Sequence, residues 1–212
     1  MSGPWLSRAN DTPTALLLID IQRGLNTSNG YYGTERSTPG FEENIERLLS
    51  GARKHNDSNP ERPVFIEHVY HESSDPRSPL YPGSNVYRGD SEFQAIAKPN
   101  ASSPHEAVFS KRKNSAFIDT ALESDLRDKR VKQLIIMGMA TDHCVSTSTR
   151  MACDLGVVEH NGLVIVSDAT AAFNKGRFDA ETVHQVNLAS LDGEFAKVLN
   201  TRQVLNELLG ET

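Results

Sequence analysis

A cysteine that follows a buried strand is the reactive feature from which we start. Residues 134–137 are apolar, Gly138 interrupts the run, and Cys144 follows a short polar turn at the start of a helix-like pattern. A cysteine at the amino end of a helix feels a positive partial charge, which lowers the pKa of the thiol and favours the nucleophilic thiolate. The neighbours of Cys144 are mostly polar, which argues against a purely structural cysteine. We therefore predict nucleophilic chemistry at Cys144.

Two further groups occupy equivalent places in the sequence. Asp20 directly follows the apolar run 15–19, and a basic cluster at 111–113 follows a short run at 107–110. The carboxyl ends of parallel strands meet at one edge of a sheet, so these groups can converge on Cys144. Burial would suit Asp20 to general acid/base catalysis, and a nearby lysine would stabilise a thiolate. One member of the basic cluster can point into the crevice, and the pattern does not identify which one.

The sequence offers little support for a metal or a cofactor. His68 and His71 are three residues apart, but no third ligand stands at a recognised spacing. The glycine patterns of dinucleotide-binding and phosphate-binding loops are absent, and so is the nucleophile elbow of serine hydrolases. We therefore expect no metal and no cofactor.

The elements that must position these groups alternate along the chain. Six apolar runs, read as strands, are separated by amphipathic patterns, read as helices. This alternation predicts an α/β fold, a three-layer Rossmann-like arrangement in which a six-stranded parallel sheet carries helices on both faces. Thr38-Pro39 is expected to begin the first long helix and Thr201 to cap the last one. Two long segments, 24–40 and 71–106, lack either pattern, and each is open to interpretation as a lid or as an interface.

Length and charge limit the class of protein. The 212 residues fit one domain, 1–212, whose first 12 residues we expect to be a flexible segment. The net charge of −6 argues against a nucleic-acid or anionic-membrane partner, and no apolar run approaches the ~18 residues of a membrane span. The two cysteines are nine residues apart on one predicted helix and would face opposite ways. These features predict a reduced, cytoplasmic protein that acts on a small molecule.

Three ordered blocks resemble the isochorismatase-like cysteine hydrolases. Asp20 lies in LLLIDIQ, Lys111 in KRKNSAF and Cys144 in GMATDHCV, and the resemblance extends from Thr14 to Leu205. It implies that Asp20, Lys111 and Cys144 are the catalytic residues, with Lys111 as the functional member of the basic cluster. It also implies a cis peptide bond at Met139–Ala140 and an oxyanion hole formed by the backbone N–H groups of Ala140 and Cys144.

The resemblance favours hydrolysis of a C–N bond in a small amide, carbamoyl or ureido compound through a thioester on Cys144. The Asp-x-His ligand pattern of nicotinamidases is missing, so a metal-dependent nicotinamidase is not expected. A vinyl-ether hydrolase of the isochorismatase type and a catalytically idle binding or scaffold protein are the alternatives. The family also implies a homo-oligomer, a dimer or tetramer.

Substrate identity stays open at this stage. The side chains that we expect near the substrate are Gln22, His68, His143 and Phe173. Gln22 is open to a second role, the orientation of Asp20. His143 adjoins the nucleophile and either contacts the substrate or fills space.

Overall fold

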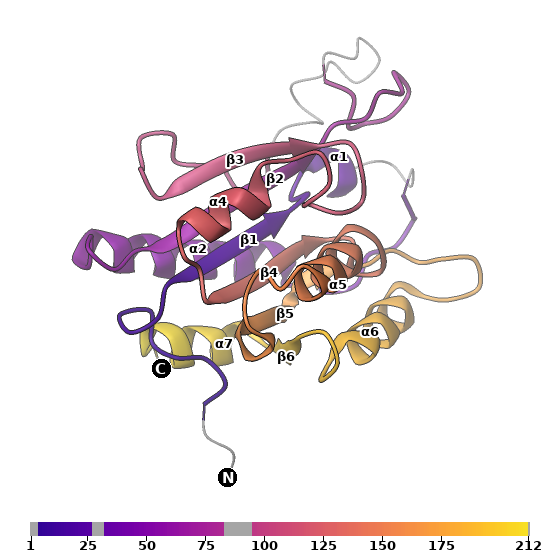
Figure 1. Cartoon of the computed structure of the whole chain (residues 1–212). Helices are drawn as coiled ribbons and strands as arrows, with labels where there is room; N and C mark the ends of the chain where they lie inside the picture. Colours follow the sequence, from indigo (N-terminus) through magenta and orange to yellow (C-terminus); the bar gives the residue numbers. More distant parts are fainter. Residues whose placement is uncertain (1–3, 27–31, 83–94, 212) are drawn as a thin grey trace.

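A computed structural model describes residues 4–26, 32–82 and 95–211 of the chain (Figure 1). Its six strands form one sheet in the order β3-β2-β1-β4-β5-β6, and every neighbouring pair is parallel. The strands are β1 (Thr14–Ile19), β2 (Val64–His71), β3 (Glu106–Lys111), β4 (Gln133–Met139), β5 (Leu163–Ala171) and β6 (Lys197–Leu199). The predicted six-stranded parallel sheet is confirmed.

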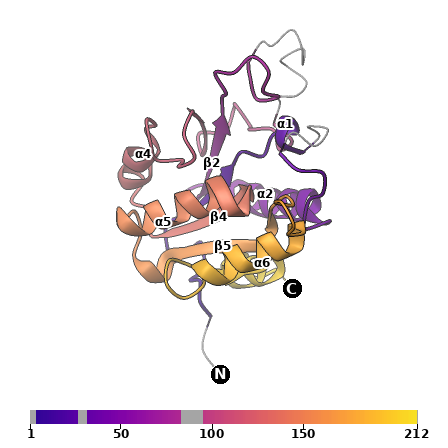
Figure 2. The same ribbon diagram turned by 90° about the vertical axis from the view of Figure 1, so that its right-hand side faces the viewer.

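Helices cover both faces of the sheet (Figure 2). On one face lie α2 (Phe41–Ser58) and α7 (Thr201–Val204), and on the other lie α4 (Leu122–Asp128), α5 (Ser146–Asp154) and α6 (Ala180–Leu191). Strand β1 serves both layers, because Leu16 and Leu18 pack toward α2 whereas Ala15, Leu17 and Ile19 pack toward the other layer. A strand buried on both faces is continuously apolar, which explains the run that precedes Asp20.

The strand order places a crevice between β1 and β4. Strands β2 and β3 extend the sheet on one side of β1, and β4, β5 and β6 extend it on the other. The connections therefore leave β1 and β4 in opposite directions, which opens a crevice at their carboxyl ends. Asp20 follows β1 and the cysteine turn follows β4, so both belong to this crevice.

Two helix starts differ from the sequence prediction. Helix α2 begins at Phe41, because Thr38 adopts a left-handed backbone with φ 58° and so cannot open the helix. Helix α7 is capped by Asn200 and not by Thr201: the Asn200 side chain accepts from the Gln203 N–H, and the Gln203 side chain accepts from the Asn200 N–H. Thr201 donates instead to Asp168 through its N–H and its hydroxyl.

Part of the amino-terminal segment expected to be flexible is fixed to the body of the protein. Leu6 and Ala9 are buried in the layer that contains α2. The N–H groups of Trp5 and Leu6 donate to the Glu207 carboxylate, and the Ala9 N–H donates to the Leu208 carbonyl. These contacts correct the prediction for residues 4–12, while residues 1–3 lie outside the described chain.

The described parts of the two long segments contain one short helix, α1 (Arg23–Asn26), and residues 27–31 and 83–94 of these segments lie outside the described chain. The described parts of these segments pair with residues that follow the carboxyl ends of the strands. Isolated antiparallel bridges join Gln22 with Ala95 and Arg36 with Phe173. Among the described residues we find no helix with the length and apolarity needed to span a membrane.

Candidate active site

Three polar groups meet in the crevice, and each comes from the end of a different strand. Asp20 follows β1, Lys111 is the last residue of β3, and Cys144 lies in the turn after β4. Asp20 takes a left-handed backbone conformation with φ 52°, and its N–H donates to the Val69 carbonyl at 2.8 Å. This conformation is uncommon for residues other than glycine, although aspartate is one of those that tolerate it. The fixed backbone therefore aims the Asp20 carboxylate.

Lys111 contacts both Asp20 and Cys144. Its Nζ donates to Asp20 Oδ2 at 2.8 Å and to Cys144 Sγ at 3.2 Å. A further contact, at 3.0 Å, is to the Lys113 carbonyl. Asp20, Lys111 and Cys144 are all buried, while Arg112 and Lys113 are exposed. The structure thus brings the three predicted residues together and places Lys111, of the basic cluster, at the centre.

The thiol of Cys144 does not have the lowered pKa that its helix position suggested. Burial raises the pKa of the Cys144 thiol, the Asp20 charge raises it further, and Lys111 opposes both. Burial also disfavours the ammonium of Lys111, but Asp20 and Cys144 outweigh it and hold the pKa of Lys111 above its ordinary value. The resting site therefore contains an ammonium and a protonated thiol, and the thiol needs a base.

Asp20 has an oxygen available for that role. Its Oδ2 accepts from Lys111, whereas its Oδ1 is buried and has no hydrogen-bond partner in the described part of the chain. A buried carboxylate oxygen without a donor is costly unless a ligand or a reacting proton completes it. One carboxylate oxygen of Asp20 lies within 4.8 Å of Cys144 Sγ, so the carboxylate belongs to the same small space as the thiol.

The turn that carries Cys144 is wound more loosely than an α-helix. Residues Thr141–Val145 form a π-helical turn, and α5 begins only at Ser146. The N–H groups of His143 and Val145 both donate to the Ala140 carbonyl, at 3.0 and 3.2 Å. The peptide bond between Met139 and Ala140 is cis. Cys144 thus precedes the regular helix and projects from its supporting turn into the crevice.

A glycine allows β4 to deliver this turn. Gly138 has φ 131°, and a Cβ added to it would lie 2.0 Å from the carbonyl oxygen of Ile19. The pairing of β4 with β5 also shifts register between Ile136 and Gly138. Only a residue without a side chain fits this close approach of β4 to β1. The glycine that interrupts the apolar run is therefore required by the backbone that leads to Cys144.

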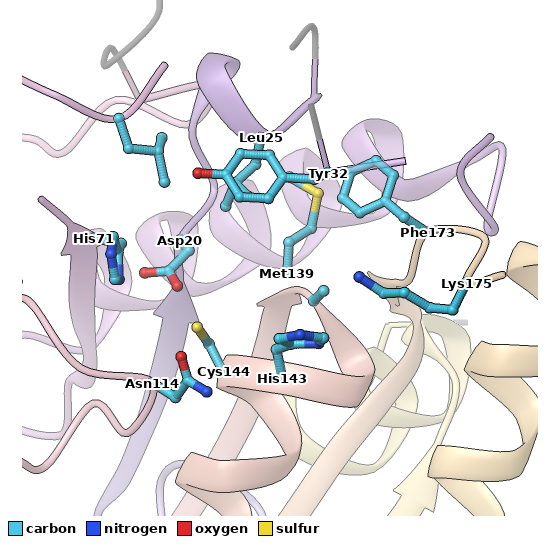
Figure 3. A pocket seen from close by; sticks show the side chains of 12 residues that line it. Asp20, Leu25, Tyr32, His71, Asn114, Met139, His143, Cys144, Phe173 and Lys175 are labelled. Atoms are coloured by element: carbon cyan, nitrogen blue, oxygen red, sulfur yellow. The ribbon is translucent and has the colours of Figure 1, made fainter. Parts of the chain in front are cut away.

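A pocket with a volume of about 210 Å³ opens beside these groups (Figure 3). Much of its wall is apolar, and its polar groups gather on two sides. The lining residues are Asp20, Leu25, Tyr32, His71, Leu80, Asn114, Met139, Ala140, His143, Cys144, Phe173 and Lys175. A small, largely apolar cavity with a few convergent polar groups is typical of a small-molecule site.

Two of the four side chains expected near the substrate line this pocket, His143 and Phe173. The other two do not. Gln22 is fully buried, and both ends of its amide bind the His71 backbone, with its oxygen accepting from the N–H and its nitrogen donating to the carbonyl. His68 is buried beside Glu106, with 3.3 Å between Nε2 and the carboxylate. Gln22 therefore links the end of β1 to the end of β2. His68 lies on the face of the sheet opposite to that of His71.

His71, Asn114 and Lys175 line the pocket but were not among the side chains expected near the substrate. His71 pairs in register with Lys111 across β2 and β3, and its Nδ1 lies 3.4 Å from the Lys111 Nζ. Burial and the Lys111 charge lower the pKa of His71 and keep its ring neutral. Side chains alternate between the two faces of a strand, so His68 and His71, three residues apart on β2, point to opposite faces. This alternation is the sequence signal that distinguishes the two histidines.

Asp20, His71 and Cys144 each offer one potential metal-ligating atom, and these atoms lie close enough together to hold a metal ion. The Nζ of Lys111 contacts an atom of all three residues, at 2.8, 3.4 and 3.2 Å respectively. The ammonium therefore occupies the position in which a cation would satisfy these groups. The three groups therefore fit a protonated lysine at their centre.

Comparisons with known proteins identify the family of this chain. The model of the isochorismatase domain matches residues 14–203. The chain belongs to the isochorismatase family. An uncharacterised member of the family from Bacillus subtilis, YrdC, is 34% identical over 200 residues, covering 92% of this chain and 96% of its own. The family match makes the protein an isochorismatase-family hydrolase.

Further members resemble the chain in sequence and in structure. A crystal structure of an isochorismatase-family protein from Chromobacterium violaceum has a TM-score of 0.80 and 30% identity, covering 100% of both chains. The ureidoacrylate amidohydrolase of Rhizobium rhizogenes is 27% identical over 195 residues, covering 82% of this chain and 76% of its own. The fold is thus shared with the Chromobacterium violaceum protein over the whole chain.

Proposed function

We propose that this protein is a cysteine hydrolase that cleaves the C–N bond of a small amide, carbamoyl or ureido compound through a thioester on Cys144. One observation carries the proposal: a buried thiol, a buried ammonium and a buried carboxylate with one unpartnered oxygen meet at a small pocket. These are a nucleophile, a fixed cation and a base, which is the set that acyl transfer requires.

In the first half of the reaction, Asp20 Oδ1 takes the proton of the Cys144 thiol. The sulfur attacks the carbonyl carbon, and the carbonyl oxygen becomes an oxyanion. Lys111 stabilises the thiolate through the contact at 3.2 Å. We assign the oxyanion to the N–H groups of Ala140 and Cys144, the donors that the family resemblance implies. The N–H groups of His143 and Val145 in the same turn bind the Ala140 carbonyl.

The intermediate then collapses. The C–N bond breaks, the proton held by Asp20 passes to the leaving nitrogen, and an acyl thioester remains on Cys144. Water attacks this thioester, Asp20 takes a proton from the water, and the C–S bond breaks to release the acid. Cys144 recovers its proton from Asp20, so that one water is consumed in each cycle. The same carboxylate serves as base and as acid, as general acid/base catalysis at a single group requires.

Two lines support an amide over a vinyl ether. A buried base that returns its proton to a leaving group serves an amine, which needs that proton to depart. The matched relative from Rhizobium rhizogenes is an amidohydrolase. A pocket of about 210 Å³ limits the substrate to a small molecule.

Intact-mass spectrometry with a panel of primary amides and ureides tests the proposal. We expect a transient acyl adduct on the Cys144 peptide in the wild-type protein. Cys144→Ala should lower turnover by more than about 10³-fold, because the nucleophile is removed. Cys153→Ala is the matched control, since it also removes a free thiol but one outside the pocket.

Turnover in Cys144→Ala within tenfold of wild type would overturn the thioester mechanism. Ether cleavage that survives Cys144→Ala but is lost in Asp20→Asn would favour the vinyl-ether alternative. Absence of any turnover, together with absence of an acyl adduct on Cys144 across the panel, would favour a catalytically idle protein.

A further inference from the structure

A second charged group faces the pocket, on the side away from Asp20 and His71. Figure 3 shows the Lys175 side chain extending into the pocket, with its amino end between Phe173 and His143. Its side chain is 39% exposed. In the described part of the chain its ammonium makes no hydrogen bond to a protein acceptor, and its nearest carboxylate oxygen, Asp142 Oδ2, is 3.9 Å away. Lys175 therefore retains donors for a ligand.

Asp142 contacts two residues on this side of the pocket and does not itself line the pocket. Its Oδ2 lies 2.6 Å from His143 Nδ1 and 3.9 Å from Lys175 Nζ. The carboxylate is largely buried, with 10% of its side chain exposed. Burial alone would raise the pKa of Asp142, but His143 and Lys175 outweigh it and hold the pKa below its usual value. Asp142 thus orients His143 and Lys175 from outside the pocket lining.

The backbone at Lys175 is fixed as firmly as that of a regular element. Lys175 and Phe178 exchange two backbone hydrogen bonds of 2.9 Å around a tight turn. The preceding residue, Asn174, receives the N–H groups of Thr34 and Glu35 on its side-chain oxygen, and its own N–H donates to the Glu35 carbonyl. Two segments about 140 residues apart in sequence therefore hold the base of the Lys175 side chain.

We propose that Lys175 binds a carboxylate of the substrate, so that the amide or ureide cleaved at Cys144 carries a carboxylate at its other end. The inference rests on the proposed function for the scissile bond and adds the identity of the opposite end. A lysine ammonium is a compact charge with three donors, and its hydrogen bonds to carboxylates are charge-assisted. The apolar wall between Cys144 and Lys175, formed partly by Met139 and Phe173, suits a short hydrocarbon connection.

Charge balance within the pocket supports an anion at this place. The Lys111 ammonium is hydrogen-bonded to the Asp20 carboxylate, so that pair is neutral. His71 is neutral, since burial and Lys111 lower its pKa. Among the described residues that line the cavity, Lys175 is a further cation, while its counterion Asp142 does not line it. A substrate carboxylate therefore meets a positive charge on entering beside Lys175.

Paired alkylating reagents test this inference without a known substrate. N-iodoacetylglycine carries a carboxylate, and N-iodoacetylglycinamide is its uncharged counterpart of nearly equal size. Both alkylate a thiol with loss of iodide, and mass spectrometry of the Cys144 peptide gives the rate for each. We expect wild-type protein to react faster with the acid, relative to the ratio for free cysteine. Lys175→Met should lower that preference about tenfold, the scale of one charge-assisted contact in a half-exposed site.

Two further variants complete the design. Lys175→Arg keeps the charge and should retain the preference. Lys54→Met removes the same charge from an exposed position on α2 and should leave the preference unchanged. A preference that is absent in wild type, or equal in Lys175→Met and Lys54→Met, would overturn the assignment. Because alkylation needs no amide turnover, this failure is distinguishable from failure of the proposed hydrolysis, which the acyl-adduct experiment reports.

Discussion

At the scale of single residues, Asp20 has two roles that separate by substitution. Its Oδ2 neutralises Lys111, and its Oδ1 is assigned as the base for Cys144. Asp20→Asn keeps the shape of the side chain but removes the charge and the base. We expect activity to fall by about 10²–10⁴-fold, the usual contribution of a positioned acid/base group.

Asp20→Asn should also lower the free energy of unfolding, by about 3–5 kcal/mol, because it leaves the buried Lys111 charge unpaired. Urea unfolding checks this. The double variant Asp20→Asn with Lys111→Met removes both charges and should recover part of the stability without recovering activity. Equal stability of the single and double variants would show that the pair is not coupled as its 2.8 Å contact indicates.

At the scale of elements, the turn after β4 depends on Gly138. Gly138→Ala would place a Cβ 2.0 Å from the Ile19 carbonyl oxygen, at a φ of 131°. We expect a loss of about 2–4 kcal/mol in the free energy of unfolding, because β1 and β4 must separate to relieve the clash. Thermal or urea unfolding measures the loss, and activity should fall with it because Asp20 and Cys144 follow these two strands.

Gly156 supplies the matched control for Gly138. It also has a positive φ, 56°, but a Cβ added there meets nothing within 4 Å. Gly156→Ala should therefore cost only the backbone strain, about 1–2 kcal/mol. An equal cost for the two substitutions would contradict the close approach of β4 to β1.

Helix α6 is linked to the cysteine turn through His184. The buried His184 ring lies 2.8 Å from the Thr141 hydroxyl through Nδ1 and 3.1 Å from the Ser167 carbonyl through Nε2. A carbonyl only accepts, so Nε2 carries the proton and Nδ1 accepts from Thr141. Burial lowers the pKa of His184, in agreement with this neutral form.

We expect His184→Leu to destabilise the protein by about 1–3 kcal/mol for each buried partner left unsatisfied. Thr141→Val removes one of those partners from the other side. In a double-mutant cycle the two substitutions should couple by about 1 kcal/mol, as measured by urea unfolding. Simple additivity would mean that α6 does not hold the turn through this contact.

The sequence was informative where a local pattern determines the structure. Uninterrupted apolar runs predicted the strands, and the positions just after them predicted that Asp20 and Cys144 share a crevice. The pattern did not identify which residue of 111–113 enters the crevice, nor did it predict that Lys175 lines the pocket. The base of Lys175 is held by Asn174 through bonds to residues 34 and 35, a contact between distant segments that no local pattern encodes.

The pKa of Cys144 is another property that the sequence did not predict, for a different reason. A helix amino end predicts a lowered pKa, but burial beside the Asp20 carboxylate raises it. Both effects are physically sound, and the burial that decides between them is a property of the assembled crevice. The position of Gln22 is likewise a property of the assembled crevice. Its amide forms hydrogen bonds with the His71 backbone and does not reach the pocket.

At the scale of the whole molecule, a buried acid makes stability depend on pH. Glu67 on β2 is fully buried, and its carboxylate accepts from Lys129 at 2.7 Å. Burial raises its pKa from 4.5 to about 7, although Lys129 opposes the shift. The folded protein therefore binds a proton that the unfolded chain releases between these two values. The stabilisation is complete below pH 4.5 and is lost as pH rises through about 7.

We expect the free energy of unfolding to fall by up to about 3 kcal/mol across this window from Glu67 alone. Glu67→Gln should flatten this part of the pH dependence, and urea unfolding at pH values between 5 and 8 measures the slope. Glu61→Gln, at an exposed position, is the control and should leave the slope unchanged. A wild-type slope that Glu67→Gln does not alter would place the titration elsewhere.

The contacts of Lys111 have a consequence for the kind of substrate that completes the site. An ammonium has three N–H groups, yet four acceptor atoms lie within 3.4 Å of this one. Asp20 Oδ1 adds a further acceptor that has no donor among the described residues. The groups around Lys111 thus include more acceptors than this ammonium has N–H donors. A primary amide or ureide brings N–H groups that supply this deficit, whereas an ester or ether of the same shape brings none. Under the proposed function, we therefore expect the acceptors around Lys111 to favour a substrate with N–H groups over an ester or ether of the same shape.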